Sequence, residues 1–481
     1  MPFPILAGKA IVDTGFNVDN SCRFNAADSP YFSKDATGDG NQRTFTISVW
    51  LKMDIMASGA SHFLFDTGTS TNRFGFYFSD PGTLQVRGKV SNTNVLVLST
   101  TNIYRDPAAW FHVYLAIDTT QAVAANRAKL YINGTQVVDS LSTATYPDQN
   151  TDFENQDASE PFEIGIDNSH DSASYFDGYM AEYMYVDGAV QAIGDFGEFD
   201  EDSPTIWKPK DISAIDVNPG AAQASNGNGF YLDFKASGNL GNDVGNNAGT
   251  DFDENNIAAT DQTTDTPTNN FCTMNPLDNY YQSATFSEGN TTLLTGSSNT
   301  SFNTSTIMPS TGKWYAECKV ITGGATANIG VIGQMATATT GEIKAKEFGY
   351  AYVSNGEFGS NGSAGSYGDS YTDDDIIGIA LDCTNNRLYF SKNGTFQDSG
   401  DPAAGSGGKT ITAPASTTMG QYSFSCSDTS TSDTRTFSWN FGNPSYANSS
   451  DAADADGYGA FEYAPPSGYY ALCTKNLAEY G

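Results

Sequence analysis

The sequence predicts an all-β protein made of two antiparallel β-sandwich (jelly-roll) domains in series, joined by a long acidic connector. Its 481 residues include 13% aromatic side chains and 48 glycines, and the residues typical of long helices are scarce. Short segments in which apolar and polar residues alternate recur about every ten residues, with turn-forming residues between them. This composition and this period favour strands over helices.

Alternating segments fill the first part of the chain and predict one sandwich over residues 13–190, preceded by a short apolar arm, residues 1–12. Trp50 and Trp110 occupy alternating positions, so we expect both in its core. Asn133–Gly134 is a strong signal for a hairpin turn. The segments are 45–53, 73–79, 83–90, 94–100, 109–118, 128–138 and 179–188.

Residues 191–270 interrupt this rhythm. They are rich in Asp, Asn, Thr and Gly and show no period, apart from one strand-like segment within 226–238. Such a composition predicts an acidic connector, in which Phe252 is an isolated apolar anchor. Few core contacts should cross a connector, so we expect fragments 1–240 and 271–481 to fold independently.

Alternation returns after residue 270 and predicts a second sandwich over residues 271–481. Trp314 and Trp439 are its expected core residues. The strand-like segments are 313–321, 327–333, 347–353, 375–383, 386–394, 421–426 and 436–442.

The charge balance excludes several classes of partner. The chain has 56 acidic and 23 basic side chains, a formal net charge of −33 at pH 7. Nucleic acids and anionic lipids both require basic clusters, so neither is an expected partner. No apolar run approaches the roughly 20 residues of a membrane-spanning helix, and the opening MPFPILAGKAIVDTG has no basic n-region. We expect a soluble protein, synthesised in a cytoplasm, that does not insert into a membrane.

The cysteines show no CxxC motif and no Cys/His spacing typical of zinc. We expect buried free thiols that behave as small apolar side chains. They are Cys22, Cys272, Cys318, Cys383, Cys426 and Cys473.

The first domain resembles the laminin-G-like, concanavalin-type sandwich. Four motifs occur in the order of that family: ISVWLK (47–52), AWFHVYLAID (109–118), KLYINGTQV (129–137) and YFDGYMAEYMYVDG (175–188).

The second domain resembles the SPRY domain. The similarity rests on GKWYAECKV (312–320), IGVIG (329–333) and above all DDDIIGIALDCTNNRLYFSKNG (373–394). The resemblance implies that partners bind at loops at one end of the sandwich.

Further segments are similar to virion proteins of marine bacteriophages, which are described as tail fibre or structural proteins. They are VDNSCRFNAADSPYFSK (18–34), NGFYLDF (228–234), DTPTNNFCTMNPLDN (265–279) and FEYAPPSGYYALCTKNL (461–477). The resemblance implies a location on the particle surface. It implies that the partners are other virion subunits and a host-surface glycan or protein. It does not decide whether the protein forms a homo-oligomer.

We therefore expect a non-enzymatic virion protein, a fibre, spike or capsid decoration that presents carbohydrate- or protein-binding loops to the host. A purely architectural subunit that cements capsid or tail is one alternative. A secreted glycan hydrolase is another, and a cellular adhesin is a third.

Neither the acidic fragments nor the histidines predict an active site. A glycan hydrolase needs paired carboxylates. The nearest fragments, EIGIDN (163–168) and EFDED (198–202), lack the Glu-x-Asp-x-x-Glu or Glu-x-Asp-x-Glu spacing of the glucanases that share the concanavalin-type fold. The histidines, His62, His112 and His170, have no His or Cys partner at metal spacing. No nucleophile-elbow motif occurs, so we expect no enzyme.

Four tyrosines are the candidate binding residues. Tyr350, Tyr352, Tyr367 and Tyr371 lie in segment 349–371 among Gly, Ser and Asn, a composition typical of protein-binding and sugar-binding loops. The alternative is a glycine-rich turn without a partner.

Calcium is the only candidate cofactor. The loop DATGDG (35–40) places Asp35 and Asp39 around glycine, and Ca²⁺ prefers oxygen ligands on flexible loops. The loop lacks the closing Glu of an EF-hand, and an ordinary solvated turn is the alternative.

Overall fold

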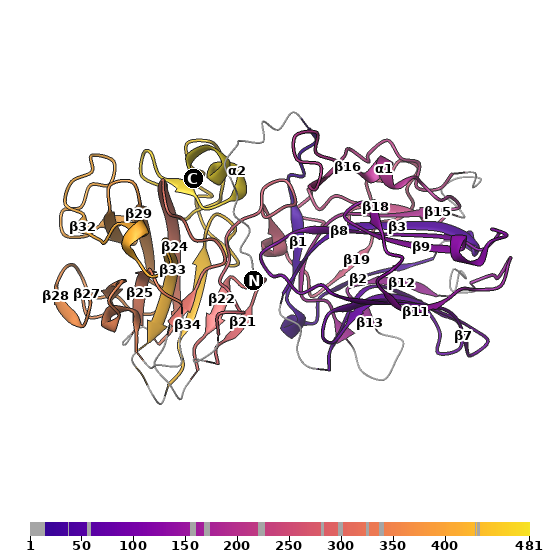
Figure 1. The fold of residues 1–481 in the computed structure, drawn as a ribbon, viewed down its shortest axis with the longest axis horizontal. Coiled ribbons are helices and arrows are strands. Elements are labelled where there is room, and N and C mark those ends of the chain that lie inside the picture. The colour runs from indigo at the N-terminus through magenta and orange to yellow at the C-terminus, as the bar shows by residue number, and fades with distance from the viewer. Residues whose placement is uncertain are drawn as a thin grey trace. The chain divides into compact units, whose positions relative to one another are not determined.

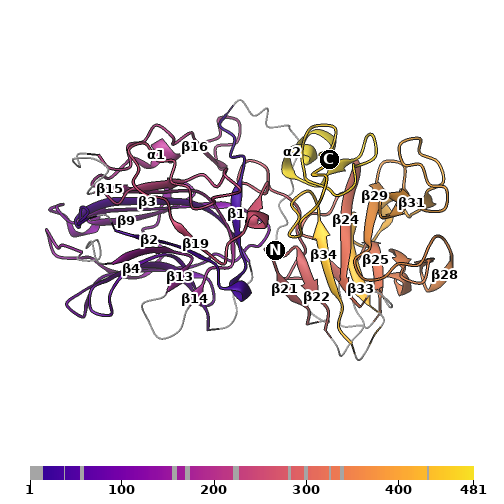
Figure 2. The same ribbon diagram turned by 180° about the vertical axis from the view of Figure 1, so that it is seen from behind.

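The computed structural model is nearly all-β, with 44% of residues in strands and 6% in helices, which confirms the predicted fold class. It has two compact units, one spanning Thr14–Thr268 and one containing Asn269–Gly481. In Figures 1 and 2 the first unit is coloured from indigo to pink and the second from pink through orange to yellow. No helix among the described residues is long and apolar enough to cross a membrane. The expected arm, residues 1–12, lies outside the described residues. The structure describes residues 15–36, 38–54, 59–153, 160–167, 174–219, 227–279, 283–296, 302–323, 327–335, 341–428, 430 and 433–481.

The first unit contains two eight-stranded antiparallel sheets stacked face to face (Figure 1). Its elements are β1 (Ser21–Phe24), β2 (Tyr31–Asp35), β3 (Thr44–Met53), β4 (Ser61–Gly68), β5 (Arg73–Ser79), β6 (Thr83–Val90), β7 (Thr93–Ile103), β8 (Phe111–Asp118), β9 (Ala128–Ile132), β10 (Thr135–Gln136), β11 (Leu141–Thr145), β12 (Pro161–Ile164), β13 (Ile166–Asp167), β14 (Ser174–Tyr175), β15 (Gly178–Asp187), α1 (Ile193–Phe196), β16 (Gly197–Phe199), β17 (Trp207–Pro209), β18 (Phe230–Leu232), β19 (Asp253–Asn255) and β20 (Gln262–Thr263). The first sheet has the order β10-β9-β8-β3-β15-β1-β20, with β18 beside β15. The second has the order β11-β7-β6-β5-β4-β12-β2-β19.

The two sheets bury one apolar core between them. Phe45 and Ile47 of β3 and Phe74 and Phe76 of β5 are fully buried in it. The rings of Phe45 and Phe74 meet edge to face, with centroids 5.1 Å apart, a favourable aromatic geometry. The inward side chains follow the period of two that the sequence shows.

The outer face of the first sheet is buried as well, because the chain that follows β15 covers it. Trp50 of β3 and His112 of β8 lie on this face, 4% and 0% exposed. Phe196 of α1 packs on Tyr114 of β8, and Trp207 of β17 stacks near His112. The outer face of this sheet is therefore an internal layer rather than a solvent-facing one.

Residues 191–268 thus belong to the first unit, which corrects the expectation of a connector. Strands β18, β19 and β20 extend the two sheets by pairing with β15, β2 and β1. Phe252 packs edge to face on Phe230 in the core, with centroids 4.8 Å apart. Strand β18 lies in the strand-like segment predicted within 226–238, whereas β19 and β20, with three and two residues, are too short to show alternation.

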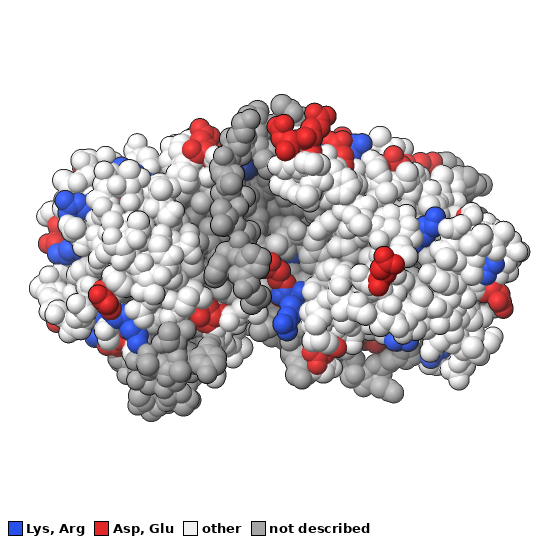
Figure 3. Space-filling view, in the orientation of Figure 1, with Lys and Arg blue, Asp and Glu red and all other residues white. Residues whose placement is uncertain are grey.

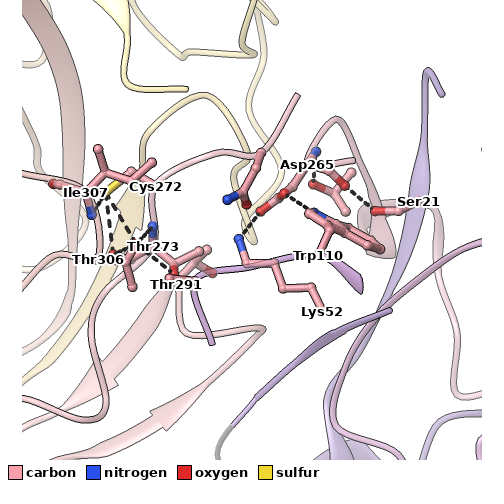
Figure 4. Close-up of polar contacts among 12 residues, drawn as sticks. Ser21, Lys52, Trp110, Asp265, Cys272, Thr273, Thr291, Thr306 and Ile307 are labelled. Carbon is pink, nitrogen blue, oxygen red and sulfur yellow. Dashed lines mark hydrogen bonds and ion pairs between the residues drawn. The ribbon is translucent and has the colours of Figure 1, made fainter. Parts of the chain in front are cut away.

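Asp265, near the end of this segment, joins it to the first sheet (Figure 4). One carboxylate oxygen lies 2.7 Å from Lys52 Nζ, and the other accepts a 2.8 Å hydrogen bond from the Trp110 indole. The Asp265 carbonyl accepts a 2.6 Å hydrogen bond from the Ser21 hydroxyl. Trp110 is only partly buried, so the expectation that it is a core residue was wrong.

The second unit is another two-sheet sandwich. Its elements are β21 (Thr285–Ser287), β22 (Thr292–Leu294), β23 (Phe302–Thr304), β24 (Lys313–Thr322), β25 (Ala327–Ile332), β26 (Gly349–Val353), β27 (Glu357–Ser360), β28 (Ser363–Ser366), β29 (Ile376–Asp382), β30 (Arg387–Lys392), β31 (Thr395–Phe396), β32 (Lys409–Thr410), β33 (Ser423–Asp428), β34 (Thr436–Asn440), β35 (Tyr470–Ala471) and α2 (Thr474–Tyr480). One sheet has the order β21-β22-β34-β24-β29-β30-β31, with β32 beside β30 and β35 beside β24. The other has the order β23-β33-β25-β26-β27-β28.

Trp314 and Trp439 are fully buried in the core of this unit, as predicted. All six cysteines are buried and free, which agrees with the expectation from their spacing. Cys272 shows how such a thiol fits a polar setting: its sulfur accepts hydrogen bonds from the Ile307 amide at 3.4 Å and the Thr306 hydroxyl at 3.8 Å (Figure 4).

Candidate functional site

A hollow of about 220 Å³ lies on the second sheet of the first unit, over β5 and β6. We call it the β5–β6 hollow; Arg73, Gly75, Tyr77, Arg87, Lys89 and Asn94 line it. The strand register explains this grouping. Arg73 pairs with Lys89 and Gly75 with Arg87, and on each strand these residues alternate with side chains of the core, so they share the outward face.

Arg73 is fixed in the β5–β6 hollow by two carboxylates. Its guanidinium lies 2.7 Å from Asp66 of β4 and 2.7 Å from Asp167 of β13. Burial alone would lower the pKa of Arg73, but the two carboxylates raise it above its ordinary value. Arg73 is therefore a cation whose charge is more than compensated by its two carboxylates.

Arg87 and Lys89 provide the unbalanced positive charge. The Arg87 guanidinium donates a 3.2 Å hydrogen bond to Gln85, while its Nε is buried and has no hydrogen-bond partner. Lys89 Nζ donates a 3.1 Å hydrogen bond to the Ser70 carbonyl. Neither cation forms an ion pair with any residue that the structure describes.

Aromatic rings and a glycine shape the rest of the β5–β6 hollow. Tyr77 stacks on Phe63 of β4, with centroids 4.4 Å apart and planes 14° apart, and the Arg73 guanidinium lies over the same Phe63 ring at 5.2 Å. Gly75 leaves the space between them open. A methyl group there would meet Asp66 and Phe63 at 3.5 Å, an ordinary contact distance.

The four predicted binding tyrosines are buried, which contradicts the expectation that their rings face a ligand. Tyr350, Tyr352, Tyr367 and Tyr371 are 7%, 0%, 5% and 3% exposed and belong to the core of the second unit. The Tyr371 hydroxyl donates to the carbonyl of Tyr352, and the Tyr367 hydroxyl accepts from the Phe390 amide. Burial raises the pKa of Tyr371 well above its ordinary value.

The segment that contains these tyrosines does have a second hollow, of about 270 Å³, over β27 and β28. Phe358, Ser360, Lys409 and the four residues of β28 line this β27–β28 hollow. Lys409 is balanced by Asp398 at 2.7 Å and lies over the Phe358 ring at 5.7 Å. Its neutral lining contrasts with the cationic β5–β6 hollow.

The candidate calcium ligands, Asp35 and Asp39, are both exposed. Asp35 is the last residue of β2, and Asp39 lies in the loop after it. No group of three or more His, Cys, Asp or Glu side chains that could hold a metal ion occurs among the described residues. The two aspartates therefore have no third acidic ligand among the residues that the structure describes.

His112 and Ser48 form a hydrogen-bonded pair, but the direction of the hydrogen bond is opposite to the one that catalysis requires. Its Nε2 lies 2.8 Å from the Ser48 hydroxyl, and its Nδ1 accepts a 3.2 Å hydrogen bond from the Trp207 indole. An indole N–H can only donate, so in the neutral ring the proton is on Nε2 and points at Ser48. A general base would need that nitrogen free. Burial lowers the pKa of His112 to about 3.

The remaining histidines and acidic fragments do not form a catalytic group. His62 Nδ1 accepts a hydrogen bond from the Asp177 amide, and burial lowers its pKa to about 4; His170 lies outside the described residues. Glu163 is 5% exposed and pairs in register with Asp66, which is buried against Arg73.

Glu198 lies in a different sheet from Glu163. It is on β16, where two lysines, Lys208 and Lys210, neutralise it at 3.6 and 3.8 Å. The fold therefore does not bring Glu163 and Glu198 together, and Glu198 shares Lys208 with Asp200 of its own fragment.

Glu182 is a buried carboxylate whose titration can be measured. It accepts a 2.5 Å hydrogen bond from the Tyr231 hydroxyl, and its other oxygen is buried without a hydrogen-bond partner. Burial raises its pKa from 4.5 to about 7. The folded protein then binds this proton more tightly than the unfolded chain, so the stability from Glu182 is greatest below pH 4.5 and falls as the pH rises through 7.

We predict that wild-type protein loses about 2.5 kcal/mol more stability between pH 5 and pH 8 than Glu182→Gln does. Urea unfolding at the two pH values measures the difference. Glu198→Gln, at an exposed carboxylate, is the control and should keep the wild-type pH dependence. Equal pH dependence in wild type and Glu182→Gln would show that Glu182 is ionised throughout this range.

The sequence contained a signal for the β5–β6 hollow. The outward positions of RFGFYFS and TLQVRGKV read Arg-Gly-Tyr and Arg-Lys, a concentration of basic side chains on one face in an acidic chain. Both segments were predicted as strands, but their pairing was not predicted, so the face they share could not be seen. On the face of the molecule in Figure 3, acidic and basic side chains are scattered and form no continuous basic stripe.

Comparison with known families agrees with both predicted domains. Residues 26–192 match the laminin G family model of the concanavalin A-like lectin/glucanase superfamily, and residues 313–401 match the SPRY domain model. The chain contains a concanavalin A-like domain and a SPRY domain. The match to the concanavalin A-like domain ends at residue 192, so most of the layer that covers its first sheet lies beyond the match. No curated protein matches the chain.

Three solved structures are similar to parts of the chain. The SPRY domain of human HERC1 is 15% identical, over 34% of this chain and 96% of that one, with a TM-score of 0.26. A heptameric SAP-like pentraxin from Limulus polyphemus is 15% identical, over 37% of this chain and 82% of that one, with a TM-score of 0.27. A proposed carbohydrate-binding protein from Bacteroides ovatus is 17% identical, over 37% of this chain and 46% of that one, with a TM-score of 0.26.

Proposed function

We propose that this protein is a non-enzymatic structural component of a bacteriophage particle, a fibre, spike or capsid decoration that binds a host-surface carbohydrate or protein. The observation that supports binding most directly is the β5–β6 hollow, an open site with unbalanced charge on a rigid sheet. Binding residues are effective when a packed scaffold holds them in place. The sequence similarity to virion proteins of marine bacteriophages supports the location on a particle.

A binding role fits the concanavalin A-like and SPRY domains.

Three features argue that the protein binds without hydrolysing. The buried Ser48–His112 pair has its proton on the nitrogen that a base would need free. Asp66 forms a buried ion pair. Glu198 is neutralised by lysines. None of these groups is both free and accessible for acid–base chemistry.

The test uses the purified full chain and the intact particle. We expect gold-labelled antibody against the protein to decorate particle surfaces, and the fluorescent protein to adsorb to host cells. We expect the protein to release no reducing ends from laminarin, agar, alginate or host envelope polysaccharide. Sustained release that disappears in Glu163→Gln or Glu198→Gln would overturn the non-enzymatic assignment, and absence of label from the particle would overturn the location.

A purely architectural role is the second candidate, and β28 favours it. This strand is the edge of its sheet, and all four of its residues are exposed, so a strand from a neighbouring subunit could pair with it. Particles that lack the protein distinguish the two roles. Intact particles with reduced adsorption support host binding, whereas failed assembly supports cementing.

A further inference from the structure

We infer that the β5–β6 hollow binds an acidic sugar through its carboxylate or sulfate group. This inference rests on the proposed function and names the class of ligand. Arg87 and Lys89 are the residues that recognise the anion, and Tyr77 and Gly75 shape the space for the sugar ring.

The charge of the site supports an anionic ligand. The charge of Arg73 is more than compensated by its two carboxylates, whereas Arg87 and Lys89 form no ion pair with the described residues. Arg87 also has a buried Nε without a partner. A buried donor without an acceptor costs free energy, so an oxygen from a ligand at this place would satisfy it. Guanidinium groups match carboxylate and sulfate oxygens with two parallel hydrogen bonds.

The size and lining of the hollow favour a sugar over an acidic peptide. Its volume of about 220 Å³ is below the roughly 300–1,000 Å³ of sites for drug-sized ligands, so it fits one small unit. Tyr77 provides an apolar ring with a polar tip beside the cations, and a sugar ring presents both kinds of surface. A peptide segment would gain most by pairing with a strand edge, but β5 and β6 are each paired on both sides.

The acidic character of the whole protein makes this site selective. A net charge of −33 repels acidic polymers at long range, so attraction must come from close contact with Arg87 and Lys89. Charge contacts of this kind weaken as salt screens them.

The experiment measures binding of the full chain to immobilised polymers by biolayer interferometry. The probes are alginate, a sulfated carrageenan, neutral dextran and polyglutamate. We expect the wild type to bind alginate or carrageenan and to bind dextran and polyglutamate at least tenfold more weakly. Comparing the affinity for alginate with that for carrageenan shows whether the site prefers a carboxylate or a sulfate group.

Three variants locate the site. Arg87→Ala and Lys89→Ala should each weaken binding about tenfold. Gly75→Ala should weaken it about threefold without a change of charge, because the methyl group occupies the hollow at ordinary contact distances. The matched control is Lys129→Ala, which removes the same charge from β9 in the other sheet. Thermal melting checks that each variant is folded.

The outcomes separate this inference from the proposed function. The inference is overturned if Arg87→Ala and Lys89→Ala bind the acidic polymers as tightly as the wild type does. It is also overturned if the wild type binds none of the polymers. Polyglutamate binding that depends on Arg87 overturns it in favour of an acidic peptide. Adsorption of the protein to host cells, measured in parallel, tests the proposed function by itself and survives if only the sugar assignment is wrong.

Discussion

A fragment of residues 1–240 is expected to remain unfolded, whereas a fragment of residues 1–268 is expected to melt in one cooperative transition. The shorter fragment lacks β19 and β20, which extend the two sheets of the first unit. It also lacks Phe252, whose ring packs on Phe230 in the core. Loss of a buried Phe side chain alone costs about 3–5 kcal/mol.

Two buried ion pairs make the loss larger. The shorter fragment lacks Asp243, which lies 3.2 Å from Lys34, and Asp265, which lies 2.7 Å from Lys52. Both lysine side chains are 1% exposed and both carboxylates 0%. Removal of one partner from a buried pair costs about 3–5 kcal/mol. Together with the loss of Phe252 these changes cost about 9–15 kcal/mol, which is comparable with the roughly 5–15 kcal/mol that stabilises a whole domain.

The stability of both fragments is measured by thermal melting followed by circular dichroism and by unfolding in urea. The 1–268 fragment is the control for expression and solubility. A cooperative transition of similar stability in the 1–240 fragment would contradict the prediction, since it would mean that the last strands and both carboxylates are dispensable.

The alternation of apolar residues was sufficient to predict the long strands. In β3 and β24 the period of two extends over ten residues, and Trp314 and Trp439 are buried where it places them. Such runs are reliable because one face of each strand packs into a core whatever its neighbours are.

The covering layer could not be predicted from the same pattern. Ser48 and His112 are polar and alternate with core residues, as solvent-facing side chains do. In the structure they are buried and bond to each other at 2.8 Å. The polar pattern therefore hid a second buried face, and with it the need for residues 191–268 to cover that face.

The tyrosines show the limit of composition as an argument. Tyr350 and Tyr352 are two residues apart on β26, so one face holds both rings, and that face is the core. Their hydroxyls bond to groups remote in the sequence, such as Thr412 for Tyr350. A buried tyrosine with a satisfied hydroxyl and an exposed binding tyrosine look the same in a sequence. The partners that distinguish them come only from the fold.

The second large effect is expected for Asp265→Asn, which should destabilise the first unit by about 3 kcal/mol. Asparagine keeps the size of the side chain and an oxygen that can accept the hydrogen bond from Trp110. It removes the negative charge and the acceptor oxygen that lie 2.7 Å from Lys52 Nζ. Because Lys52 is 1% exposed, water cannot replace that charge, and the loss is far above the cost of breaking a surface ion pair.

The double variant Lys52→Met/Asp265→Asn tests the cause. With the ammonium removed, the asparagine faces no buried charge, so the double variant should recover more than half of the stability lost by Asp265→Asn. Arg43→Ala, which breaks an exposed ion pair with Asp152, is the matched control and should cost less than about 1 kcal/mol. Urea unfolding at neutral pH gives all four free energies. If the double variant is no more stable than Asp265→Asn, the cost arises from hydrogen bonds of residue 265 rather than from the charge of Lys52.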